Sequence, residues 1–168
     1  IARDAGLPVI LHVRKSHDEV LATLKRIRVP GGISHAFNGS LQQAEMFIDL
    51  GFKLGFGGAM THTRATKIRT LVKELPLASI VLETDAPDMP PAWLGNKARN
   101  SPLELLKIAE TLADVRRMSV SQIIEITGKQ ISTSQDIRFS IPFVIVPRPK
   151  QAQLFGVRPA RQPIAAIR

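Results

Sequence analysis

The sequence predicts an α/β fold in which parallel strands alternate with helices. Short apolar runs flanked by glycine recur along most of the chain, and each is followed by a segment with apolar residues at helical spacing. The first run, Leu7–Val13, is apolar except for Pro8 and His12, as expected for a strand covered on both faces. Four such runs occur, which is the content of half an eight-stranded (β/α) barrel or of most of a small doubly wound sheet.

Helices are predicted after the first two strands. Ser16 and Glu19 form a candidate capping box for the first helix, and a Pro-Gly-Gly break precedes a strand at Ile33–Phe37. Ser40 and Gln43 open the second helix, which a following glycine is placed to close. Apolar residues at helical spacing support both helices: Val20, Leu21, Leu24 and Ile27 in the first, and Ala44, Phe47 and Ile48 in the second.

The third and fourth strands are predicted at Phe52–Phe56 and Ser79–Glu83, with a helix between them that Pro76 ends. A Pro-rich loop at 85–99 follows the fourth strand. Two further helices are predicted, one opened by Ser101, Pro102 and Glu104 as N-cap, first helical position and capping box, and one running from about Ser119 to near Gly128. Because the chain begins within an apparent helix end and without Met, we expect part of the fold to lie upstream.

Charge is distributed unevenly along the chain. The 168 residues include 23 Lys and Arg against 14 Asp and Glu, a net charge of +9, but no acidic residue occurs after residue 137. This last segment is also rich in proline and lacks a helical period, so residues 130–168 are predicted to be a divergent, poorly ordered basic tail. The alternative is a non-catalytic module that binds nucleic acid through this tail, although few aromatic residues are available there for stacking.

Composition excludes several classes of protein. The hydrophobic fraction of 44% supports a packed core, and no apolar run approaches the ~18 residues of a membrane span. There is no cysteine, which is typical of a cytoplasmic protein and leaves histidines and carboxylates as the ligands for any metal.

Polar residues that can bind a metal stand at the ends of three predicted strands. His12 ends the first strand, His35 lies near the end of the second, and Glu83 and Asp85 follow the fourth. The carboxyl ends of parallel strands form one rim, where ligands bind in such folds. Two imidazoles and a carboxylate there are suitable ligands for Zn²⁺, Mn²⁺ or a similar ion. The alternative is a small doubly wound domain whose histidines only satisfy hydrogen bonds.

Two further histidines are given no role in such a site. His17 lies at a predicted helix start and His62 in a loop, and both are expected to be solvated.

Three motifs together resemble the C-terminal half of TatD-type metal-dependent deoxyribonucleases, which are (β/α) barrels of the TIM type. They are His-Val-Arg at 12–14, Gly-Ile-Ser-His-Ala-Phe-Asn-Gly-Ser at 32–40 and Leu-Glu-Thr-Asp-Ala-Pro at 82–87. Gly-Phe-Gly-Gly at 55–58 and Asn-Ser-Pro at 100–102 fall at matching positions. The resemblance covers residues 1–129, which we take as a partial TatD-like hydrolase domain, and ends where Gly-Lys runs into Gln-Ile-Ser-Thr. A frame change or fusion near residue 130 is our hypothesis for this ending.

The resemblance implies a divalent metal, either Mg, Mn or Zn, and DNA as the substrate. It implies His12, His35 and Asp85 as metal ligands, with Asp85 also the catalytic residue that handles protons. Roles in supporting the site or contacting substrate are implied for four further residues: Glu83, Arg14, Asn38 and Ser40. Backbone amides at 38–40 would favour an anion at this rim.

The family's N-terminal His-x-His motif and bridging Glu are not in this sequence. We therefore expect a truncated fragment with weak metal binding and little or no hydrolysis. We also expect poor solubility or oligomerisation unless another chain supplies the missing half of the barrel.

Overall fold

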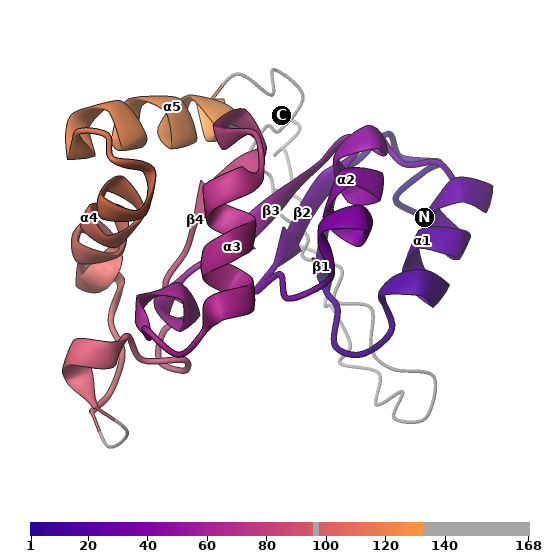
Figure 1. Cartoon of the computed structure of the whole chain (residues 1–168). Helices are drawn as coiled ribbons and strands as arrows, with labels where there is room; N and C mark the ends of the chain where they lie inside the picture. Colours follow the sequence, from indigo (N-terminus) through magenta and orange to yellow (C-terminus); the bar gives the residue numbers. More distant parts are fainter. Residues whose placement is uncertain (96–97, 133–168) are drawn as a thin grey trace, which may run out of the picture.

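One parallel sheet organises residues 1–95 and 98–132, the part of the chain that the computed structural model describes (Figure 1). Its strands are β1 (Val9–His12), β2 (Gly32–His35), β3 (Phe52–Phe56) and β4 (Ile80–Leu82). They pair in the order β1-β2-β3-β4, and every pair is parallel. In the common doubly wound sheets the strand order reverses, so that the first four strands stand as 3-2-1-4 or 2-1-3-4, whereas a barrel wall adds each strand on the same side. The sequential order therefore confirms the barrel prediction over the doubly wound alternative.

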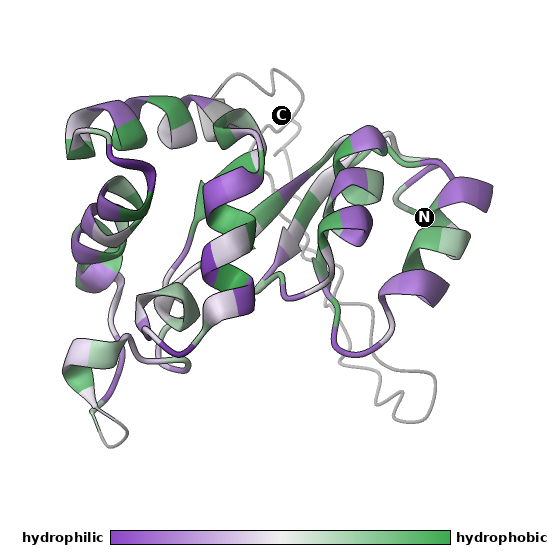
Figure 2. Cartoon of the chain, in the orientation of Figure 1, coloured by the Kyte–Doolittle hydropathy of each residue, from purple (hydrophilic) through white to green (hydrophobic). Residues whose placement is uncertain are grey.

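Helices follow the strands and cover one face of the sheet, with α2 and α3 lying in front of the strands in Figure 1. Figure 2 shows the amphipathic character of the helices as bands of hydrophobic and hydrophilic residues. The last two helices contact each other and both contact β4. The α-helices are α1 (His17–Arg26), α2 (Leu41–Asp49), α3 (Thr66–Glu74), α4 (Leu105–Arg116) and α5 (Val120–Ser132), and the short 3-10 helices are η1 (Gly58–Thr61), η2 (Leu77–Ser79), η3 (Ala92–Leu94) and η4 (Pro102–Glu104).

The core between the sheet and the helices is built on four phenylalanines that are almost fully buried. Phe37 packs edge-on against Phe47 and Phe56, with ring centroids 5.9 and 6.2 Å apart, and Phe47 packs in the same way on Phe52. Edge-to-face contacts of this kind stabilise aromatic pairs beyond the area that they bury, by about 0.5–1.5 kcal/mol each.

The register places the strand-end histidines on the opposite face from this core. Leu11, Ser34 and Leu54 form one buried row across β1, β2 and β3. Because side chains alternate along a strand, the next residues, His12 and His35, point to the other face. The core holds the strands in register, and the site faces away from it.

Two predicted capping boxes are wrong, although the helices that they were expected to open are present. The Ser16 side chain makes no capping bond to α1. Ser101 caps the N–H of Leu103, two positions on, but the Glu104 carboxylate accepts a hydrogen bond from the Trp93 indole at 2.7 Å instead of returning to the cap. The first turn at this end is the 3-10 helix η4.

Helix α5 continues to Ser132, past the expected end near Gly128 and across the predicted domain boundary at residues 129 and 130. The rest of the predicted basic tail, residues 133–168, lies outside the described residues, as does the alternative of nucleic-acid binding through it. In the described ranges no helix has both the length and the apolar character needed to cross a membrane.

Candidate functional site

The site is built on a pair of histidines from neighbouring strands. The parallel register sets His12 of β1 opposite His35 of β2. His12 Nδ1 and His35 Nε2 lie 2.8 Å apart, so one ring nitrogen donates a hydrogen bond and the other accepts it. The ring centroids are 5.0 Å apart. The pairing of the two strand ends therefore brings two imidazoles together, as expected from the sequence.

Two carboxylates face the other nitrogen of His35. Its Nδ1 lies 3.7 Å from Glu83 Oε1 and 3.8 Å from Asp85 Oδ1. The hydrogen-bonding interaction with Glu83 raises the pKa of His35, and the charges of Glu83 and Asp85 add to this effect, while partial burial opposes it. The carboxylates thus fix which edge of His35 is turned toward His12.

Glu83 is held in place by the backbone of the neighbouring strands. The N–H of Ala36 donates to Glu83 Oε1 at 2.6 Å. A Cβ at position 55 would lie only 2.3 Å from Glu83 Oε2, so glycine at this position of β3 leaves room for the carboxylate. Gly55 therefore makes room for Glu83, a role that sequence analysis did not assign to it.

Asp85 sits in a loop that a buried asparagine ties together. Asn100 is 3% exposed, and its Nδ2 donates to the carbonyl oxygens of Thr84 and Asp88. Its Oδ1 accepts a hydrogen bond from the N–H of Ser101 at 2.9 Å. Asp85 itself adopts a positive φ of 54°. Sequence analysis missed this positioning role, because an asparagine before a helix start has no local signal that distinguishes a loop anchor from a turn residue.

The other three residues implied by the resemblance do not touch the histidine pair. Arg14 is exposed, and its side chain takes no part in the hydrogen bonds or ion pairs of the described residues. The backbone oxygen of Asn38 accepts from Lys67 Nζ at 2.7 Å. Ser40 caps α2, because its hydroxyl accepts from the N–H of Gln43 while the Gln43 side chain accepts from the N–H of Ser40. Of the backbone amides at 38–40 that we expected to face an anion, that of Ser40 is therefore satisfied by the capping box.

The prediction that His17 is solvated is wrong. This residue is 8% exposed, and its ring packs edge-on against Phe37 and Phe47. Burial lowers the pKa of His17, the nearby charge of Lys67 lowers it further, and Asp18 opposes both. His62 is exposed as predicted.

The imidazoles and carboxylates at this rim are groups of the kinds that bind a divalent metal ion. Neutral imidazoles and carboxylates are suitable ligands, and a carboxylate on the far nitrogen of a histidine fixes the tautomer that presents the near nitrogen to a metal. Asp85, however, lies next to Nδ1 of His35, as Glu83 does, whereas His12 lies next to Nε2. Within residues 1–95 and 98–132 no group of three or more His, Asp or Glu is arranged to hold a metal ion. The described residues thus offer a supported imidazole pair rather than a complete coordination set.

Comparison with known proteins identifies the family of the chain. Residues 1–133 match the sequence model of the family described as TatD related DNase. The chain is 44% identical over 126 residues to the uncharacterized metal-dependent hydrolase YjjV of Escherichia coli K12, covering 74% of this chain and 48% of that protein. It is 34% identical over 122 residues to the 3'-5' ssDNA/RNA exonuclease TatD of Klebsiella pneumoniae strain 342, covering 69% of this chain and 46% of the exonuclease.

Solved structures agree with the sequence matches. The crystal structure of the E. coli K12 TatD homologue YjjV superposes with a TM-score of 0.71 at 42% identity, covering 77% of this chain and 50% of the homologue. A TatD-family hydrolase from Entamoeba histolytica shares the fold, with a TM-score of 0.63 at 19% identity over 75% of this chain and 50% of its own. The chain spans about half the length of the curated relatives that it matches. It belongs to the TatD-related DNase family, and its sheet is part of the (β/α) barrel of these metal-dependent hydrolases.

Proposed function

We propose that this chain carries the C-terminal part of the active site of a metal-dependent hydrolase that cleaves phosphodiester bonds in DNA. The observation that carries the proposal is the His12–His35 pair at the carboxyl ends of β1 and β2, with Glu83 behind His35. The names of the relatives support the same chemistry, since they include metal-dependent hydrolases and a 3'-5' ssDNA/RNA exonuclease.

His12, His35 and Asp85 are the residues proposed to hold the metal. A divalent ion bound at such a site activates water and neutralises negative charge on the phosphoryl oxygens. Glu83 orients His35 through its Nδ1 edge. The Asp85 side chain is 34% exposed, so it can exchange a proton with solvent as well as face His35. Mg²⁺, Mn²⁺ and Zn²⁺ all suit a mixed nitrogen and oxygen donor set.

By itself the chain is proposed to bind metal weakly and to hydrolyse little or no DNA, because the His-x-His motif and the bridging Glu that the resemblance implies are not in its sequence. Calorimetric titration with Mn²⁺ and a nuclease assay on single-stranded DNA test this. Robust turnover by the chain that Asp85→Asn abolishes would overturn the proposed inactivity.

The catalytic assignment is tested by joining the full chain to the N-terminal half of E. coli YjjV. The fusion is expected to release nucleotides from single-stranded DNA only when a divalent metal is added. Asp85→Asn and His35→Asn are expected to remove this activity, and Glu83→Gln to lower it by about 10–100-fold. Glu74→Gln, an exposed carboxylate change at the end of α3, is the matched control.

A folded fusion that hydrolyses neither DNA nor RNA with any of the three metals would contradict the proposal. Equal activity in Glu83→Gln and Glu74→Gln would show that Glu83 has no role in the site.

A further inference from the structure

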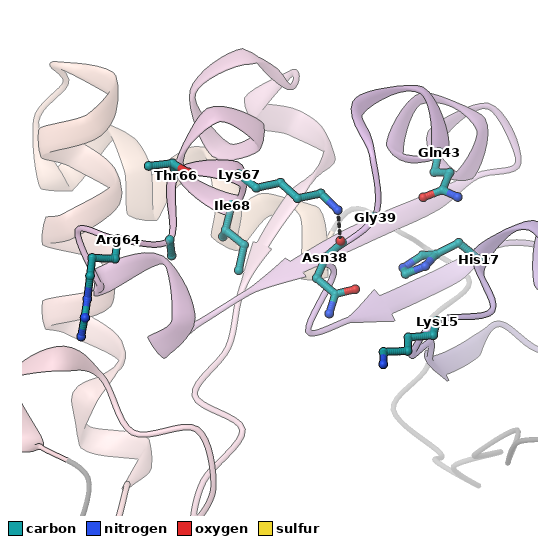
Figure 3. Close-up of a pocket in the computed structure, with 10 residues that line it drawn as sticks. Lys15, His17, Asn38, Gly39, Gln43, Arg64, Thr66, Lys67 and Ile68 are labelled. Atoms are coloured by element: carbon teal, nitrogen blue, oxygen red, sulfur yellow. Dashed lines mark hydrogen bonds between the residues drawn. The ribbon is translucent and has the colours of Figure 1, made fainter.

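A cavity lies where the chain leaves the carboxyl ends of β1, β2 and β3, and Figure 3 shows the residues that line it. Its volume is about 490 Å³, within the range of ligand-binding cavities. Three successive connections line it: the segment after β1 supplies Lys15 and the first residue of α1, His17; the loop after β2 supplies Asn38; and the segment after β3 supplies Arg64 and, in the first turn of α3, Lys67. We call this space the basic cavity.

The lining of the basic cavity is positively charged. It includes Lys15, Arg64 and Lys67, and no Asp or Glu. Lys15 and Arg64 are exposed, and neither forms an ion pair with a carboxylate of the described residues. Lys67 reaches across the cavity to the backbone oxygen of Asn38, as Figure 3 shows, and retains two further N–H donors. These groups are free to bind an anion.

The start of α3 adds backbone donors to the same cavity. Ala65 is the N-cap of α3 and offers no side-chain capping bond, and the first turn contains no acidic residue. The N–H groups at an uncapped helix N-terminus favour a bound anion. Helix α2, by contrast, has its capping box. The starts of α1, α2 and α3 all line the basic cavity, and α1 and α3 lack a side-chain cap there.

His17 supplies an independent indication of a ligand. Its side chain is almost completely buried, yet it lines the basic cavity, and its Nε2 has no hydrogen-bond partner among the described residues. Figure 3 shows the ring directed from the start of α1 toward Asn38. Buried polar atoms are nearly always paired, so the unpaired Nε2 of a residue that lines the cavity indicates a partner that is not among the described residues.

We propose that the basic cavity binds a phosphate of single-stranded nucleic acid, next to the nucleotide that is cleaved; this inference rests on the proposed function. A smaller cavity of about 50 Å³ contains Glu83 and Asp85, and it shares Asn38 and Ile68 with the basic cavity. A strand whose scissile phosphate lies at the carboxylates therefore passes a neighbouring phosphate into the basic cavity. Lys15, Arg64 and Lys67 position the strand and are not catalytic residues.

The test measures binding without metal, so that it is independent of hydrolysis. A fluorescent oligothymidylate is titrated with the full chain in EDTA at low salt. The double variant Lys15→Ala/Arg64→Ala is expected to bind about tenfold more weakly, as loss of one charge-assisted phosphate contact implies. The slope of log K against log salt is expected to fall by about 0.7 for the lost phosphate. Lys25→Ala/Lys73→Ala removes the same charge from exposed helix ends and is expected to have little effect.

Equal weakening in the two double variants would show general attraction by positive charge and would overturn the proposal. Unchanged binding in Lys15→Ala/Arg64→Ala would overturn it as well. Inorganic phosphate forms a second arm: if it binds in a manner that depends on Lys15 and Arg64 while the oligonucleotide does not, the cavity is a site for a free anion and not for a strand. A fusion that fails to hydrolyse DNA but retains Lys15- and Arg64-dependent binding separates this inference from the catalytic one.

Discussion

At the scale of single residues, His17 connects the core with the rim of the sheet. One side of its ring packs on Phe37, and its Cδ2 lies 3.1 Å from the position that a Cβ on residue 39 would occupy. The same Cβ would lie 2.6 Å from the Phe37 ring. Glycine at position 39 is therefore needed for the close packing that buries a neutral imidazole.

This burial predicts how stability depends on pH. The pKa of His17 is lowered in the folded state, while its value in the unfolded chain is about 6.5. Below that pH the unfolded chain binds a proton that the folded protein resists, so the free energy of unfolding falls as the pH falls. Urea unfolding between about pH 7.5 and 5 measures the free energy of unfolding, and in His17→Gln the part of its pH dependence that comes from His17 is expected to be absent. The charges of Lys67 and Asp18 that face the ring are the same in both proteins. An identical pH dependence in the two would contradict the prediction.

Gly55 gives a second prediction at this scale. In Gly55→Ala the new methyl group would force the Glu83 carboxylate away and deprive the N–H of Ala36 of its acceptor. We expect a loss of about 1–3 kcal/mol in the free energy of unfolding, the typical cost of leaving a buried donor unpaired. Gly128→Ala in α5 is the control, because nothing lies within 4 Å of its added Cβ and alanine favours a helix interior. Urea unfolding that finds Gly55→Ala as stable as the parent would contradict this account of the glycine.

At the scale of elements, α3 is anchored at its C-terminal end by a side chain from another helix. Arg116 of α4 donates from Nε to the carbonyl oxygen of Val72 at 2.5 Å, and a second guanidinium nitrogen donates to the carbonyl oxygen of Leu75. The last carbonyls of a helix lack partners within the helix, and a cation there also interacts favourably with the helix dipole. Arg116 therefore links α4 to the C-terminal end of α3, and the N-terminal end of α3 lines the basic cavity.

Arg116→Ala is expected to lower the free energy of unfolding by about 2–3 kcal/mol, because two half-buried carbonyls lose a charged donor. Arg116→Lys is expected to recover part of this loss, since an ammonium group can bond one carbonyl but lacks the planar fork of arginine. Arg26→Ala at the exposed end of α1 is the control. Denaturant unfolding of the three variants measures their free energies of unfolding, which are expected to be lowest for Arg116→Ala, higher for Arg116→Lys and highest for Arg26→Ala. Equal stability of Arg116→Ala and Arg26→Ala would contradict this order.

The helix caps show how much of the local structure could be predicted from the sequence. The capping box of Ser40 and Gln43 formed as expected because both partners lie on one turn of α2. The box expected at Glu104 failed because Trp93, distant along the chain, competes for the carboxylate. Local sequence alone therefore does not decide a cap, since a tertiary partner binds the Glu104 carboxylate and the Ser16 side chain makes no capping bond.

The candidate site follows the same distinction. The proximity of His12 and His35 could be predicted, since both end neighbouring parallel strands. The Asn100 anchor and the burial of His17 could not, because each depends on segments brought together only by the fold.

At the scale of the whole molecule, the described sheet has two edge strands and a face that is only partly covered. β1 and β4 each pair on one side. Ile10 and Ile33 lie on the face opposite the phenylalanine core, and both are half-buried. Exposed edges and apolar faces promote association with other chains.

We therefore expect the chain to self-associate as its concentration rises, and the fusion with the N-terminal half of YjjV to remain monomeric. Sedimentation velocity over a range of concentrations measures both. A chain that stays monomeric throughout, with a fusion that does not differ from it, would contradict the expectation.

The sequential, parallel order of the strands also restricts how any partner can complete the rim. A strand joining the β1 or β4 edge in the direction of its neighbours brings its own carboxyl end to the side where His12 and His35 stand. An antiparallel strand would present its amino end there instead. A parallel neighbour thus offers the imidazole pair the segment that follows its strand, and an antiparallel neighbour offers the segment that precedes its strand, so the direction of the backbone decides which part of a partner can supply further ligands.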